Sequence, residues 1–464
     1  MTQPPMTQPP MTQPPMTQPP LAPQRLAIRG DLLDFSAAPG LADLDSPAVR
    51  WRPDHWLLVE AGRISGAQTA EPDSLWQKVD HSGRLILPGF IDTHVHSAQI
   101  DVIGAWGAQL LDWLETYTYP AEARFAEPVH AASHSTLFLD SLLAVGTTAA
   151  AVFPSVHKVS VDALFGAAQQ RGMRLITGKV LMDRHAPQQV LDDVDQAEAD
   201  CADLIARWHQ RGRLAYAVTP RFAPTSSNAQ LAMAGRLLAS TPGLYMQTHV
   251  AENRDEVRWV AELFPAARSY LDVYHRHGLL NERAILAHGI WLDDADRAVL
   301  RETGAHVAHS PSSNLFLGSG LFGWREMVDA GAALSLGSDV GGGTSLSMRR
   351  TLGDAYKVQA MAGTRLTGWA LLHAATRGAA QALGLAQEIG SLEAGNLADV
   401  CVWDWASTPL AQRRQDVARS LHEKTFAWIT MAGDADLVET YVAGRRLYQR
   451  HPQAGAVASF ARHD

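Results

Sequence analysis

The chain has 464 residues, of which 46% are hydrophobic and 19% are charged, an ordinary composition for a globular protein with a large core. Lysine and arginine number 39 against 48 aspartate and glutamate residues, so the formal net charge of −9 disfavours nucleic acid or an anionic membrane as a partner. No apolar run reaches about 18 residues, so we expect no membrane span. With only two cysteines, Cys201 and Cys401, and no recognisable secretory signal, the sequence predicts a cytoplasmic protein.

Residues 1–20 consist of four copies of the pentapeptide Met-Thr-Gln-Pro-Pro. Proline has no backbone N–H, and the repeat offers little apolar surface to bury, so neither a helix nor a strand is stable there. We therefore predict a disordered tail over 1–20.

The two flanking parts of the chain, 21–87 and 390–464, share a pattern of short strands separated by glycine and proline. Strand-like runs occur at 26–30, 56–60, 399–404 and 438–446. Because chain ends commonly lie close in space, we expect both parts to form one small β-sandwich domain.

Residues 88–389 follow a different pattern, in which short apolar runs alternate with helical spacing. The eight runs are 85–90, 147–153, 174–180, 215–218, 244–247, 284–286, 305–307 and 332–336. This alternation predicts an α/β protein with a (β/α)8 TIM barrel over 88–389. The competing interpretation is an open doubly wound sheet. A Gly-x-Gly-x-x-Gly fingerprint after the first strand would favour it, but the sequence has none there.

Polar residues follow most of these apolar runs. In a (β/α)8 barrel the carboxyl ends of the strands carry the functional residues. The residues in these places are His94, His96 and Gln99 after the first run, Arg221 and Phe222 after the fourth, His249 and Glu252 after the fifth, His288 after the sixth, His309 after the seventh, and Asp339 after the eighth. This arrangement predicts a functional site at one end of the barrel.

His94 and His96 are two residues apart, so their side chains point to the same side of a strand, here the barrel interior. Two imidazoles buried there need a partner, and a divalent metal supplies one. His249 and Asp339 can complete a set of nitrogen and oxygen ligands without sulfur. Such a set is typical of a catalytic zinc rather than a structural one.

Each of these residues also has a plain structural interpretation when it is taken alone. His249 fits a core histidine, and Asp339 fits a turn because three glycines follow at 341–343. His306 and His309 lie close to another strand end, and spacing alone does not exclude them from a metal site. We place His309 near the site and interpret His306 as structural.

Segment 88–96, Pro-Gly-Phe-Ile-Asp-Thr-His-Val-His, resembles the first metal-binding strand of the amidohydrolase superfamily. Segment 390–399 resembles that superfamily's return into its small β domain. More narrowly, four further segments resemble the guanine deaminase family, at 111–120, 219–222, 249–253 and 337–345.

The resemblance implies a zinc-dependent hydrolase that deaminates guanine to xanthine and ammonia. It implies one Zn²⁺ per subunit, held by His94, His96, His249 and Asp339, with His288 beside the attacking water. A small-molecule purine is then the expected partner. The resemblance also favours a homodimer.

For this reaction we expect three catalytic residues. Asp339 accepts a proton from water, and His288 hydrogen-bonds the water and stabilises the developing charge. Glu252 is the expected general acid, which protonates ring N3 and passes a proton to the leaving amine.

The residues expected to bind the substrate are Gln99, Arg221 and Phe222. Arg221 can donate to the purine O6, Gln99 offers a donor and an acceptor to a ring edge, and Phe222 gives an apolar contact. Trp113 and Tyr117 are four residues apart, and either a cover over the pocket or plain helix packing explains them.

Three other interpretations compete with this one. A related aminohydrolase acting on an oxidised guanine, a pterin or a triazine needs the same ligands and differs only in its pocket. A non-enzymatic scaffold on a decayed barrel is disfavoured because all four ligands are present. A polynucleotide base deaminase uses Cys-x-x-Cys zinc ligands and a basic surface, which the two isolated cysteines and the charge of −9 contradict.

Overall fold

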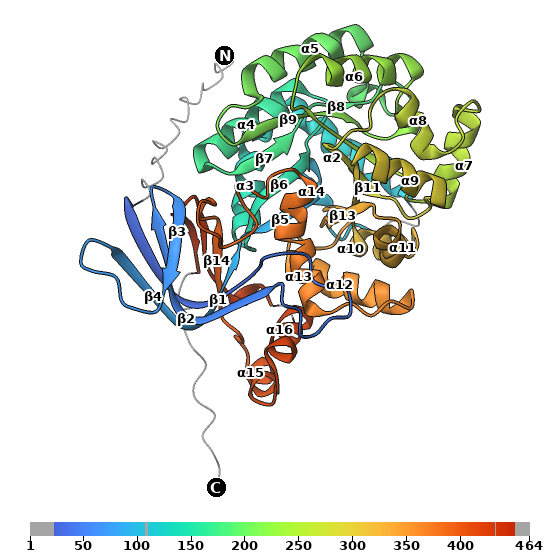
Figure 1. The fold of residues 1–464 in the computed structure, drawn as a ribbon. Coiled ribbons are helices and arrows are strands. Elements are labelled where there is room, and N and C mark those ends of the chain that lie inside the picture. Colours follow the sequence, from blue (N-terminus) through green and yellow to red (C-terminus); the bar gives the residue numbers. More distant parts are fainter. Residues whose placement is uncertain (1–22, 107–109, 432, 451–464) are drawn as a thin grey trace, which may run out of the picture.

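The computed structural model describes residues 23–106, 110–431 and 433–450. Its strands form two sheets, one nearly closed into a barrel and one built from both ends of the chain (Figure 1). The tail predicted over 1–20 lies outside the described residues. Among the helices of the described ranges, none has the length and apolarity needed to cross a bilayer.

Eight parallel strands form the barrel in chain order. They are β5 (Phe90–His96), β6 (Thr147–Phe153), β7 (Arg174–Thr177), β9 (Leu214–Pro220), β10 (Tyr245–Val250), β11 (Ala284–His288), β12 (His306–His309) and β13 (Ala333–Leu336). A short strand, β8 (Val180–Leu181), pairs with β9. The ring closes where the N–H of Asp339 donates to the His94 carbonyl, and the N–H of His96 to the Val340 carbonyl, both at 2.8 Å. The predicted (β/α)8 barrel is confirmed.

The first barrel strand begins later than the sequence pattern indicates. Residues 85–88 belong to β4 (Gln77–Pro88) of the other sheet, and β5 starts at Phe90. Both strands are buried along this stretch, so they read as one apolar run. Gly89 is the single residue between the two strands, and it passes close to Thr148. A Cβ at this position would lie 2.1 Å from Oγ1 of Thr148, so only glycine fits there. The two histidines of this segment therefore lie on the strand itself, at its carboxyl end.

Helices cover the outside of the barrel (Figure 1). Those between barrel strands are α3 (Pro128–Leu143), α4 (Lys158–Arg171), α5 (Val194–Trp208), α6 (Asn228–Ser240), α7 (Arg254–Leu263), α8 (Tyr270–Arg276), α9 (Asp294–Thr303), α10 (Pro311–Phe316) and α11 (Trp324–Asp329). Those after the last barrel strand are α12 (Met348–Met361), α13 (Gly368–Ala374), α14 (Arg377–Ala382), α15 (Pro409–Asp416) and α16 (Leu421–Thr430).

A chain of short helical turns connects β5 to α3 and reaches over the carboxyl end of the barrel. It comprises η1 (Ser97–Val102), α1 (Leu110–Trp113), η2 (Leu114–Thr118), α2 (Tyr119–Ala123) and η3 (Arg124–Ala126). Three further turns are η4 (Gln188–Val190), η5 (Ala223–Thr225) and η6 (Asp434–Asp436). Apolar residues of the connection pack on the ends of β6 and β8.

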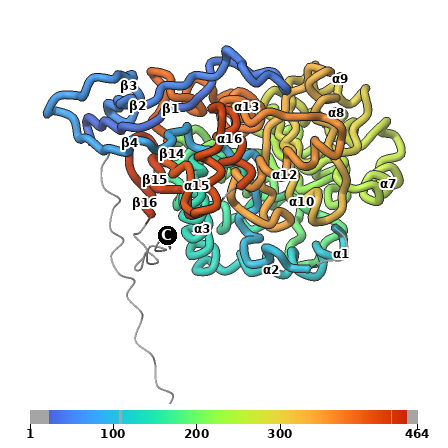
Figure 2. The backbone as a smooth tube through the Cα atoms, turned by 90° about the horizontal axis from the view of Figure 1, so that it is seen from below, coloured from blue at the N-terminus to red at the C-terminus, as the bar shows by residue number. Residues whose placement is uncertain are grey.

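Both ends of the chain contribute to the second sheet, as predicted. Its seven strands run in the order β16-β15-β14-β4-β1-β2-β3, with β1 and β4 parallel and the other pairs antiparallel. The strands not yet given are β1 (Arg25–Phe35), β2 (Val49–Glu60), β3 (Arg63–Gln68), β14 (Val400–Trp403), β15 (Leu437–Val442) and β16 (Arg445–Gln449). Figure 2 shows these strands together at one side of the barrel. The exact domain boundaries at 87 and 390 stay a prediction.

Arg349 of α12 connects the barrel to the second sheet. Its guanidinium donates to Oδ2 of Asp436 at 2.7 Å and lies 4.0 Å from the ring centre of Trp428. Both charged side chains are buried, so each compensates the other's loss of hydration.

Candidate active site

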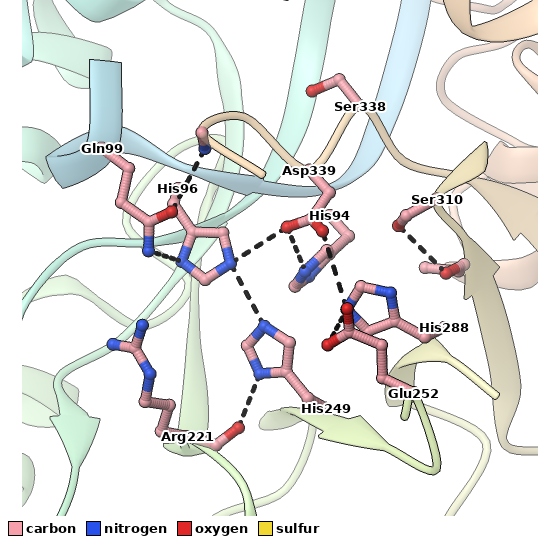
Figure 3. A network of polar contacts seen from close by, with 12 residues as sticks. His94, His96, Gln99, Arg221, His249, Glu252, His288, Ser310, Ser338 and Asp339 are labelled. Carbon is pink, nitrogen blue, oxygen red and sulfur yellow. Dashed lines mark hydrogen bonds and ion pairs between the residues drawn. The ribbon is translucent and has the colours of Figure 1, made fainter. Parts of the chain in front are cut away.

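Strand ends of the barrel bring five polar side chains to one place (Figure 3). His94 and His96 lie on β5, His249 on β10, and His288 ends β11, while Asp339 lies in the loop after β13. His288 and Asp339 have φ angles of 70° and 51°, a left-handed region that costs a non-glycine residue about 1–3 kcal/mol. The surrounding barrel maintains this strain at the point where the side chains converge.

Four of these side chains, all except His96, are close enough to share one ion. One ligand atom from each of His94, His249, His288 and Asp339 lies within 4.8 Å of the others. Nε2 of His96 is adjacent, 3.2 Å from Nε2 of His249 and 3.3 Å from Oδ1 of Asp339. Nε2 of His94 lies 3.0 Å from the same Oδ1.

The rings of His249 and His288 each form a hydrogen bond through Nδ1, on the side away from the cluster. These bonds direct the lone pair of each Nε2 atom toward the centre of the cluster. Nδ1 of His249 donates to the carbonyl of Arg221 at 2.7 Å, and Nδ1 of His288 donates to Oδ1 of Asn314 at 2.8 Å. Each bond holds the proton on Nδ1 and leaves Nε2 as an acceptor. Apart from its 3.0 Å contact with Oδ1 of Asp339, the buried Nε2 of His94 has no polar partner among the described residues. Converging nitrogen lone pairs without donors fit a divalent cation.

The protonation states agree with that fit. Burial lowers the pKa of His96 to about 4 and the pKa of His249 well below its ordinary value, so both rings are neutral at pH 7. For Asp339, burial alone would raise the pKa, but the facing His94, His96 and His288 together outweigh it and the pKa falls well below the ordinary range. The cluster therefore offers neutral imidazoles and one carboxylate.

A cavity opens beside this cluster, and every residue predicted to act on the substrate lines it. Its lining residues are His96, Gln99, Leu110, Trp113, Leu114, Arg221, Phe222, His249, Glu252, His288, Ser313, Leu317, Asp339 and Gly342. The apolar members provide flat walls for a planar ligand, and the polar members lie at defined edges.

Glu252 lies at the edge of the cavity next to His288. Its Oε2 atom is 3.4 Å from Nε2 of His288, and Oε1 accepts from the hydroxyl of Ser319 at 2.9 Å. Burial and the nearby Asp339 charge raise the pKa of Glu252. A carboxyl group that stays protonated near pH 7 can donate a proton to a ligand.

Glu256 at the start of α7 stabilises the turn that carries Glu252. Its Oε2 atom accepts from the backbone N–H groups of Glu252 and Asn253, both at 3.1 Å, and its Oε1 atom accepts from the hydroxyl of Tyr270 at 2.6 Å. Asn253 caps the helix in return. The turn is thereby fixed from both sides.

Arg221 and Gln99 form the polar wall opposite Glu252. Both are buried, and both contact the carboxylate of Glu122, which lies on α2. The guanidinium of Arg221 also lies 5.4 Å from the ring centre of Tyr119. Because Arg221 is buried, its ion pair with Glu122 is not a surface salt bridge.

The two aromatic residues considered as a cover are placed differently. Trp113 lines the cavity and donates its indole N–H to the carbonyl of Ala105 at 3.1 Å, whereas Tyr117 is not among the lining residues. His309 stacks on Phe322 at 4.4 Å between ring centres and does not line the cavity. His306 is buried, and within the part of the chain that the structure describes neither of its ring nitrogens has a hydrogen-bond partner.

Sequence reasoning missed several residues that support the site. They are Glu122, Glu256, Asn314 and Ser319. Asn314 and Ser319 follow the seventh apolar run, and both lie within twelve residues of its end at 307. Glu122 lies on a helix and carries no signal in its spacing, whereas the spacing of Glu256 from Asn253 indicates only a helix cap.

The sequence model described as "Amidohydrolase family" matches residues 85–447. Guanine deaminase of Escherichia coli (strain K12) is 42% identical over 431 residues, which cover 92% of this chain and 98% of the relative. A solved structure of E. coli guanine deaminase superposes with a TM-score of 0.88 at 40% identity, covering 92% of this chain and 99% of that one. A structure of guanine deaminase from C. acetobutylicum with bound guanine gives 0.83 at 25% identity, covering 91% and 100%.

The chain therefore belongs to the amidohydrolase family. Within that family the relatives that it matches over most of its length carry the name guanine deaminase. The recognition of the chain as an enzyme of this group is confirmed.

Proposed function

We propose that the protein is a zinc-dependent guanine deaminase, which hydrolyses guanine to xanthine and ammonia. The observation that carries the proposal is a cavity in which a cluster of histidines and Asp339 lies beside Glu252, whose pKa is raised, and the buried Arg221. The relatives named guanine deaminase support the choice of substrate.

We infer that one Zn²⁺ per chain is held by His94, His96, His249 and Asp339, with His288 next to it. Neutral imidazole nitrogen and carboxylate oxygen are ligands that suit zinc. When bound, zinc supplies a Lewis acid that lowers the pKa of a coordinated water from 15.7 to about 7.

The chain's own residues then move the protons. Asp339 takes up the proton that the water loses, and His288 hydrogen-bonds the water through Nε2 and orients it toward C2 of guanine. The water oxygen bonds to C2, and Glu252 protonates ring N3. Glu252 then delivers the proton held by Asp339 to the exocyclic nitrogen, and the bond between C2 and that nitrogen breaks, so ammonia leaves. The proton of the new C2 hydroxyl passes to Glu252, which leaves the C2 carbonyl of xanthine and restores the protonated carboxyl group.

Substrate orientation comes from the opposite wall. Arg221 donates to O6 of guanine, and Gln99 contacts the adjoining ring edge. Phe222 packs against the ring. A buried donor left without its acceptor penalises a purine that lacks the oxygen.

The test is ultraviolet monitoring of guanine conversion to xanthine, together with ammonia release, by the zinc-loaded protein. A parallel panel of oxidised guanine, pterins and triazines separates the proposal from an aminohydrolase of another heterocycle. Guanine as the preferred substrate supports the proposal, and preference for any other panel member overturns it. The cytoplasmic location and the homodimer also stay proposals, and light scattering after gel filtration measures the second.

A further inference from the structure

Glu122 joins the two polar residues proposed to bind the substrate. It lies on α2 with its side chain fully buried. Both carboxylate oxygens accept from Nη1 of Arg221, at 2.8 and 2.6 Å, and Oε1 also accepts from Nε2 of Gln99 at 2.9 Å. A carboxylate buried without such donors is costly, so the three side chains hold one another in place.

The contact with Glu122 fixes the orientation of the Gln99 amide, that is, which partners its nitrogen and its oxygen face. Oε1 of Gln99 accepts from the backbone N–H of Gly341 at 3.2 Å, and Nε2 donates to Oε1 of Glu122 at 2.9 Å. Exchanging the two ends would set an amide oxygen against a carboxylate and an amide nitrogen against an N–H. Gln99 therefore offers a ligand only the free lone pair of Oε1, as an acceptor for a ring N–H.

Arg221 is left with donors for the ligand. Glu122 occupies Nη1, and among the described residues Nε and Nη2 have no hydrogen-bond partner. Because the carboxylate balances the guanidinium charge, the pair offers N–H donors without a net charge. Such a wall suits a neutral carbonyl oxygen better than an anionic group.

We propose that Glu122 is a positioning residue that makes the site selective for a neutral ring carbonyl next to a ring N–H, as in a 6-oxopurine. It acts through Arg221 and Gln99, which it orients as donor and acceptor. The inference rests on the proposed function for the identity of the ligand, and it adds the residue that determines the selectivity.

Calorimetric titration of zinc-loaded protein with hypoxanthine and with unsubstituted purine tests the inference without relying on turnover. Hypoxanthine has the 6-carbonyl and the adjacent N1–H, and purine, whose N–H lies in the five-membered ring, lacks both of these groups. We expect the wild-type protein to bind hypoxanthine at least about tenfold more tightly than purine, as a hydrogen bond from a charged donor implies. In Glu122→Gln the new amide nitrogen faces the donors of Arg221 and Gln99. The affinity for hypoxanthine should therefore fall by about tenfold, while the affinity for purine stays within about twofold of the wild-type value.

Asp436→Asn is the matched control, because it makes the same change beside another buried arginine, Arg349, outside the cavity. It should lower the unfolding temperature and leave the ratio of the two dissociation constants unchanged. The inference is overturned if Glu122→Gln weakens the binding of hypoxanthine and purine equally, or if the ratio of their dissociation constants does not change. Guanine turnover by the wild-type protein is measured alongside. Its absence contradicts the proposed function, whereas a ratio that depends on Glu122 still supports the positioning role.

Discussion

The carboxyl group of Glu252 lies 3.4 Å from Nε2 of His288, at the ends of the neighbouring strands β10 and β11. Asn314 holds the proton of His288 on Nδ1, so the facing Nε2 atom is an acceptor. Burial favours the protonated form of Glu252. An acid and an acceptor therefore lie side by side next to the metal cluster, which is the arrangement that proton transfer to a bound heterocycle requires.

Replacing Glu252 by glutamine tests its role as the general acid. Glutamine keeps the size and the hydrogen bond with Ser319 but has no proton to transfer. We expect kcat to fall by about 10²–10⁴ while the zinc content, measured by atomic emission, stays the same. Glu262→Gln on the exposed face of α7 is the control and should leave kcat unchanged. Near-normal guanine turnover by the Glu252 variant would remove this residue from the mechanism.

Arg221→Ala tests the recognition of the substrate oxygen. Loss of the donor should lower kcat/KM for guanine by about tenfold to a hundredfold. The variant also leaves Glu122 buried without its partner, so the free energy of unfolding should fall by about 3–5 kcal/mol.

The double variant Arg221→Ala, Glu122→Gln separates these two effects. It removes the unpaired charge and should recover part of the stability, measured by urea unfolding, but none of the lost kcat/KM. Unchanged kinetics in the single variant would contradict the assignment of Arg221 to the oxygen.

Several of these residues were predictable from the sequence because strand ends carry a regular signal. His94, His96, His249, His288 and Asp339 were all selected from their places after apolar runs, and the structure brings them together. The start of β5 was not predictable. The last residues of β4 and all residues of β5 are buried, so no polar residue marks the point where one strand ends and the next begins.

Glu122 was unpredictable for a different reason. It lies 99 positions from Arg221 in the chain, on a short helix that has its own apolar neighbours. No local pattern records a contact of that range, and only the folded barrel brings the two side chains together. The same holds for Glu256, whose position at the start of a helix predicts capping and not a contact with a catalytic turn.

His306 predicts a pH dependence of stability. Burial lowers its pKa to about 4, against about 6.5 in the unfolded chain. Below pH 6.5 the unfolded state binds the proton and the folded state does not, so stability falls as the pH drops from about 6.5 to about 4 and then levels off.

His306→Leu should remove this contribution. The difference in unfolding free energy between wild type and variant should change by about 1.4 kcal/mol per pH unit within that window. Urea unfolding at several pH values measures the difference. A difference that does not vary with pH would show that His306 has the same pKa in the folded and unfolded states.

The central claim is that the histidine and aspartate cluster holds a metal ion on which guanine deamination depends. Ultraviolet monitoring of guanine conversion before chelation, after removal of the metal, and after return of one equivalent of zinc tests it most directly. We predict that conversion to xanthine stops in the metal-free protein and recovers with zinc. Conversion at an undiminished rate by protein shown to be metal-free would contradict the account.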